Sequence, residues 1–131
     1  MINQLSDIIA VLILSDANVD PQEIAAFVVG CEGLAIKTAV AEQALGKSLT
    51  EAEQSTNQDE FLRRACEAMP KARRETALAI GVSVVMANER LDRCEVDRLI
   101  ALRLMLGLPE DSLVKLVAQM SSVQPNLDVV F

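Results

Sequence analysis

The sequence predicts an all-α protein, and three observations lead to that fold class. Apolar residues recur at helical spacing along nearly all of the 131 residues. Alternation of β-branched with polar residues is scarce, and the hairpin dipeptides Asn-Gly and Asp-Gly are absent. Because 51% of the residues are apolar and only 24% are charged, the chain is expected to fold as one domain over residues 1–131.

The first half of the chain is expected to form four helices. The first runs from about Gln4 to Ser15, and the second begins after Asp20 and ends near Gly30 to Gly33. A third covers about residues 35–45, and the polar stretch 47–58 is predicted to be either a loop or a solvated helix. An amphipathic helix then resumes over residues 61–69.

The second half is expected to form three helices and a tail. Pro70 is suited to the first position of a long helix over residues 71–87, whose second half is apolar on every side. We expect this helix and the first one at the centre of a bundle, with Gly81 among the small residues that permit close packing. The next helix covers 93–106 and ends at Gly107, and Pro109 opens a last helix to about residue 120. Residues 121–131 are left as a tail.

The amino-acid composition limits the kinds of catalytic and metal-binding site that the chain can form. With no histidine, the chain lacks the commonest general base and the commonest zinc ligand. Cys31, Cys66 and Cys94 are odd in number and widely spaced, which argues against a disulfide framework and a zinc knuckle. Cys94 lies near a predicted helix start, where the dipole favours a thiolate, but an ordinary helix position is the preferred interpretation. The composition therefore removes the Ser-His-Asp and Cys-His catalytic arrangements.

The charge and hydropathy predict a cytoplasmic protein that does not bind nucleic acid and does not insert into a membrane. Twelve basic residues against 19 acidic ones give a net charge of −7, which disfavours binding to phosphate backbones. No basic residue precedes the apolar run at residues 8–14, as a signal peptide requires. The longest uncharged stretch, residues 76–88, has 13 residues, whereas a membrane-spanning helix needs about 20.

The charge is unevenly distributed between the two halves. Residues 1–60 hold ten acidic and two basic residues, a net charge of −8, while residues 61–131 hold nine acidic and ten basic residues, a net charge of +1. Basic residues gather between Arg63 and Arg74, either as a surface for an anion or a partner or as ordinary solvated helix faces. The apolar tail at 129–131 packs on its own domain or on a second subunit, so a homodimer stays open.

Two segments 72 residues apart match each other. Each follows an apolar helix and places an aliphatic residue, an Asp and, three residues later, a Glu at a predicted helix start: Asp20 with Glu23, and Asp92 with Glu95. This is the spacing of a capping box with Asp in place of Ser or Thr. The Asp oxygen is expected to accept a hydrogen bond from the amide of the third helical residue, and both carboxylates lie at the positive end of the helix dipole.

The two turns, with the Leu106-Gly107-Leu108-Pro109-Glu110 segment that follows, resemble the tellurite-resistance TerB-like family over residues 4–120. This resemblance implies a single all-α domain of about seven helices with an internal pseudo-twofold repeat. It also implies a non-enzymatic, cytoplasmic protein of tellurite or other chemical stress, with acidic turns that bind metal and a surface that docks protein partners. The family's glycine is replaced by Ala17 in the first turn and by Glu89 in the second, and its leading Asp is replaced by Asn88 in the second turn. The first turn is therefore the better candidate for a metal site.

The residues of the turns also allow a cation site. Asp16, Asn18 and Asp20 alternate as oxygen donors, and Glu23 follows one helical turn later, so Ca²⁺ or Mg²⁺ could gather them at about 2.0–2.6 Å. The loop is not an EF-hand, because its sixth position is Pro21 and its twelfth is Phe27. Capping alone accounts for Asp20, Glu23, Asp92 and Glu95, whereas Asp16 and Asn18 have no evident capping role. Both interpretations stay open.

Overall fold

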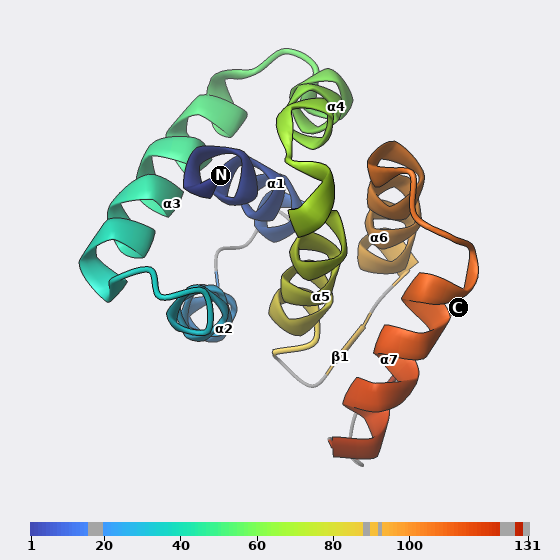
Figure 1. Ribbon diagram of the computed structural model, residues 1–131. Helices are drawn as coiled ribbons and strands as arrows, with labels where there is room; N and C mark the ends of the chain where they lie inside the picture. The colour runs from blue at the N-terminus through green and yellow to red at the C-terminus, as the bar shows by residue number, and fades with distance from the viewer. Residues whose placement is uncertain (16–19, 88–89, 92, 124–127, 130–131) are drawn as a thin grey trace.

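A computed structural model describes residues 1–15, 20–87, 90–91, 93–123 and 128–129, and it is built from helices, as predicted. Within these residues the structure has seven α-helices, one short 3₁₀ turn and two strands of two residues each (Figure 1). The α-helices are α1 (Ile2–Leu14), α2 (Pro21–Glu32), α3 (Thr38–Gln54), α4 (Gln58–Ala68), α5 (Arg74–Val85), α6 (Arg93–Leu106) and α7 (Asp111–Val123). The 3₁₀ turn is η1 (Lys71–Arg73), and the strands are β1 (Arg90–Leu91) and β2 (Asp128–Val129).

Local capping fixes several of these helix ends. Asp20 Oδ1 accepts a hydrogen bond from the Gln22 amide at 2.8 Å, and Pro21 occupies the first position of α2. Asn57 Oδ1 accepts from the Glu60 amide at 3.1 Å and begins α4 in the same way. Gly107 has a φ of 71°, the left-handed conformation that ends α6 and that glycine adopts at little cost.

Helices α1 and α5 form the centre of the bundle, as the sequence predicted. In Figure 1, α1 lies between α3 and α5, and α5 in turn packs against α1, α2, α6 and α7. Residues 8–13 of α1 are buried without interruption, and α5 has a similar buried run over residues 80–82. A helix without a polar face must be covered on all sides, and the other helices provide that cover.

Gly81 marks the closest packing at this centre. A Cβ atom placed on Gly81 would lie 3.0 Å from Leu12 Cδ1 of α1 and 3.3 Å from Leu102 Cδ2 of α6. Both leucines are buried, so they have little room to move away. The small residue expected at this position therefore admits neighbouring side chains rather than a neighbouring backbone.

The structure corrects four predicted boundaries. The third helix extends to Gln54, so most of the polar stretch 47–58 is a solvated helix, held on one face by buried Ser48 and Ala52. Pro70 precedes the 3₁₀ turn η1 instead of starting a long helix, and α5 begins only at Arg74. The last helix begins at Asp111, two residues after Pro109, and continues to Val123.

The expected tail includes a short element that periodicity did not predict. Strand β2 pairs in parallel with β1, with Arg90 opposite Asp128 and Leu91 opposite Val129. Pairing between segments almost forty residues apart leaves no local sequence signal, because each strand is too short for an alternating pattern.

Within the described residues, no helix is long and apolar enough to cross a membrane.

A polar contact links α1 to α3. Ser48 Oγ, buried in α3, donates a hydrogen bond to Asp7 Oδ1 at 2.7 Å. Burial is the largest influence on the pKa of Asp7 and raises it above the usual 3.8. Nearby Glu51 raises this pKa further, while the Ser48 hydrogen bond and Lys47 act in the opposite direction.

We predict that Asp7→Asn stabilises the protein at neutral pH. Burial raises the pKa of Asp7 in the folded protein, so folding favours the protonated carboxyl group. The stability that protonated Asp7 contributes is fully present below pH 3.8 and is lost as the pH rises through the folded-state pKa. The Asn amide oxygen still accepts from Ser48 but carries no charge. Thermal unfolding should give a higher midpoint for the variant at pH 7, and the difference should shrink towards pH 3.8. A difference independent of pH would contradict this account.

Candidate functional site at the acidic turns

The first acidic turn leads directly into α2. Asp20 is the N-cap of this helix and accepts from the second helical amide, that of Gln22, rather than from the predicted third. The Glu23 amide donates instead to the Asp20 backbone carbonyl at 3.0 Å. The Glu23 side chain is only 1% exposed, although it lies in the first turn of its helix. Asp20 therefore has a demonstrated capping role, and Glu23 points into the protein.

The glutamate that follows the second acidic turn is buried in the same way. Glu95 is the third residue of α6, as Glu23 is the third residue of α2, and it is 2% exposed. Carboxylates are seldom so fully buried, because removing the charge from water is costly unless other groups stabilise it. The pattern of Asp and Glu in the sequence correctly identified two equivalent positions, but it did not predict that both glutamates would be buried.

Residues that flank one acidic turn share a cavity with residues that flank the other turn. Ser15, at the end of α1, and Cys94, at the start of α6, line one cavity of about 370 Å³. Gln22, at the start of α2, and Ala87, after α5, line another of about 390 Å³. The sequence offset of 72 residues relates the two pairs, because Ser15 corresponds to Ala87 and Gln22 to Cys94. Such an exchange is what an internal twofold relation requires, although the repeat as a whole stays a prediction.

The predicted cation ligands are only partly described. Asp16, Asn18 and Asp92 lie outside the described residues, and Asp20, Glu23 and Glu95 lie within them. Among the described residues, no three His, Cys, Asp or Glu side chains are grouped closely enough to hold a metal ion. The cation site in the first turn, which depends on Asp16 and Asn18, therefore stays a prediction.

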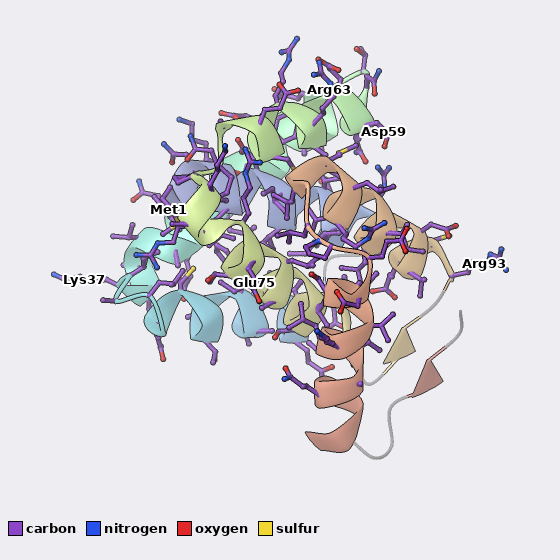
Figure 2. The ribbon with its side chains drawn as sticks, turned by 45° about the vertical axis from the view of Figure 1, so that its right-hand side comes forward. Met1, Lys37, Asp59, Arg63, Glu75 and Arg93 are labelled. Carbon is purple, nitrogen blue, oxygen red and sulfur yellow. The ribbon has the colours of Figure 1, made fainter. Side chains whose placement is uncertain are left out.

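The cluster of basic residues between Arg63 and Arg74 is largely occupied by interactions within the protein. Arg63 forms ion pairs with Glu60 and Glu67, and Arg64 pairs with Glu60 at 3.3 Å. These four residues share the face of α4 that carries the labelled Arg63 in Figure 2. The solvated-face interpretation fits these two arginines better than a surface for an anion.

Arg74 has a structural role at the junction of two helix ends. Its Nε donates to the carbonyl of Met69, after α4, at 3.2 Å. Its Nη1 donates to the carbonyl of Leu106, the last residue of α6, at 3.3 Å. Helix C-terminal carbonyls lack partners within the helix, so one guanidinium satisfies two such groups. The two remaining members of the cluster, Lys71 and Arg73, are exposed.

Two features near the turns had no counterpart in the sequence predictions. Arg98 of α6 forms an ion pair with Asp59 of α4, beside Cys94 and Ser15 in the first cavity. The second cavity is a mainly apolar groove between α2 and α5, at whose edge Val29 is 65% exposed. Both depend on contacts between distant helices, which a single sequence does not reveal. Val29 gives the only local signal, an apolar residue on the solvent side of its helix.

Comparison of the chain with protein-family models, with curated proteins and with solved structures finds no match in any of the three. The resemblance to the TerB-like family therefore stays a prediction, drawn from the two turns and the segment at residues 106–110.

We predict that Cys94 alone reacts rapidly with a thiol reagent in the native protein. Cys94 is exposed, whereas burial raises the pKa of the Cys31 thiol to about 11 and that of the Cys66 thiol to about 12. Titration with a chromogenic disulfide at pH 7 should give one fast equivalent per chain. In denaturant all three cysteines should react, and Cys94→Ser should remove the fast phase. Two or more fast equivalents in the folded protein would contradict the packing described here.

Proposed function

We propose that this chain is a non-enzymatic, cytoplasmic protein of the tellurite or chemical-stress type, with a divalent cation of the Ca²⁺ or Mg²⁺ class bound at the first acidic turn. The observation that carries the proposal is the burial of Glu23 directly after a turn with three further oxygen-bearing side chains. Its equivalent, Glu95, is buried in the same way after the second turn. A hard cation is one agent that stabilises a carboxylate in such a position.

The competing explanation is capping alone. Backbone amides at a helix N-terminus also stabilise a carboxylate, and Asp20 already accepts from one of them. Capping works equally with and without a metal ion, whereas a cation site adds stability only when the ion is present. The two explanations therefore differ in how the folded state responds to added ions.

A second candidate function is a protein interaction module, in which the turns only cap helices. The Asp20 hydrogen bond and the apolar groove between α2 and α5 favour it. The family resemblance allows both functions, because it implies acidic turns that bind metal and a surface that docks partners.

Thermal unfolding of chelator-stripped protein tests the cation. We expect the midpoint to rise with Ca²⁺ or Mg²⁺, because a ligand at 100 times its dissociation constant adds about 2.7 kcal/mol to the free energy of unfolding. Asp16→Asn should abolish this rise and leave the ion-free midpoint almost unchanged. Asp20→Asn should weaken the rise while preserving the cap, since Asn caps helices as well as Asp does.

Glu53→Gln on the exposed part of α3 is the matched control and should keep the full response. Asp20→Ala should cost about 1 kcal/mol with and without the ion, because it removes the cap. If no ion shifts the midpoint of the cooperatively unfolding protein, or if Asp16→Asn responds like the unaltered chain, the cation is excluded from this turn and the interaction module is favoured.

A further inference from the structure

The groove between α2 and α5 is formed by two antiparallel helices. Gly30, near the end of α2, packs against Ile80, since a Cβ there would lie 3.0 Å from Ile80 Cγ1. At the other end, Gln22 shares the groove with Ala87, which follows α5. Position 30 therefore lies beside 80, and position 22 beside 87, so the two helices run in opposite directions along a cavity of about 390 Å³.

The lining of this groove is apolar and shallow enough for another helix to approach. Small side chains make up most of it, and the described lining residues carry no charge. The principal ones are Ala25, Ala26, Val29 and Gly30 of α2, and Ser83 and Ala87 from the α5 side. Ser83 uses its hydroxyl internally, donating to the Ala79 carbonyl at 3.1 Å. Val29, 65% exposed at the edge, would gain most from being covered.

The part of the chain that contains α2 is acidic, and the nearest basic residues in the sequence, Lys37 and Arg90, lie beyond the two helices. Residues 1–36 contain five acidic residues and no basic one, and residues 76–88 contain no charged residue. Asp20 caps one end of α2, and the exposed Glu32 is the last residue at the other end. Across α5, Lys115 is already paired with Asp111 at 2.9 Å. Helix α2, which forms one wall of the groove, thus has an acidic residue at each end, about 18 Å apart along 12 residues, and complements an apolar segment flanked by basic residues.

We propose that this groove binds a basic amphipathic helix of a partner protein. The apolar face of that helix covers Val29 and the small residues of α2 and α5, and Lys or Arg residues about three turns apart lie near Asp20 and Glu32. The inference rests on the second function above, the interaction module, and names its partner class. It requires no ion, so the peptide measurements below are made in chelator and are independent of the cation test.

The test uses a fluorescent synthetic helix of about 18 residues with Leu at helical spacing and Lys at both ends. Its binding to the full chain is followed by fluorescence anisotropy, beside a second peptide in which every Lys is replaced by Glu. The Lys peptide should bind about tenfold or more tightly than the Glu peptide, and its affinity should fall as salt is raised. Equal binding of the two peptides, or binding of neither, would overturn the proposal.

Substitutions locate the binding surface. Ala25→Trp, at an exposed position, fills the groove, and Val29→Gln removes its apolar edge without touching the core. Each should weaken the Lys peptide about tenfold. The matched control is Val114→Gln on α7, because Val114 is 63% exposed and lies outside the groove. An unchanged affinity in Ala25→Trp, or an equal loss in Val114→Gln, would overturn the placement.

A charge variant and a mass measurement separate the remaining outcomes. Glu32→Gln keeps an oxygen for the Thr38 hydroxyl, which donates to Glu32 at 3.3 Å, but removes one charge. It should weaken the Lys peptide and reduce its salt dependence, whereas Glu53→Gln on α3 should not. Sedimentation of the unaltered chain should give a monomer that Ala25→Trp does not change. A dimer that this variant dissociates would assign the groove to a second copy and contradict the proposal.

Discussion

The fold depends on the burial of the long apolar runs in α1 and α5. Residues 8–13 of α1 and most of α5 expose almost nothing, so each helix needs neighbours all round. Two of these neighbours, α1 and α6, approach α5 closely at Gly81, which leaves space for Leu12 and Leu102. A chain with three aromatic residues fills its core with aliphatic side chains, whose packing depends on such close fits.

The same packing positions the described residues that flank the acidic turns. In the sequence, each turn follows one of the two central helices. Ser15 meets Cys94 across one cavity, and Gln22 meets Ala87 across the next. Glu23 and Glu95 are carried inward because the first turn of each following helix packs on this centre. An ion at one turn and a partner in the adjoining groove would therefore act on neighbouring parts of the molecule.

Much of the fold followed from the sequence because its signals are local. The Asp20 cap, Pro21 and Gly107 correctly predicted where α2 begins and α6 ends, and the apolar runs predicted the two central helices. The boundaries around Pro70 and Pro109 were wrong, because proline fits several positions near a helix start and packing selects among them. The β1–β2 pairing and the groove were not predicted, since both depend on contacts between distant segments.

For the candidate site, the sequence predicted the equivalence of Glu23 and Glu95 but not their burial. The spacing of Asp and Glu indicates a helix start whether or not the side chain is covered, and only the neighbouring helices decide that. The basic cluster shows the same limit. The sequence gives Arg74 only as a charged residue, whereas its hydrogen bonds to the ends of α4 and α6 exist only in the folded structure.

Substitution of two glycines tests the central packing most directly. Gly81→Val should lower the free energy of unfolding by about 1–3 kcal/mol, because its side chain collides with buried Leu12 and Leu102. Gly46→Ala, in a helix with no atom within 4 Å of the new Cβ, should raise it by about 0.5–1 kcal/mol. Chemical denaturation measures both. If Gly81→Val is as stable as the unaltered chain, α1, α5 and α6 do not meet at Gly81, and the account of the fold and of its turns is wrong.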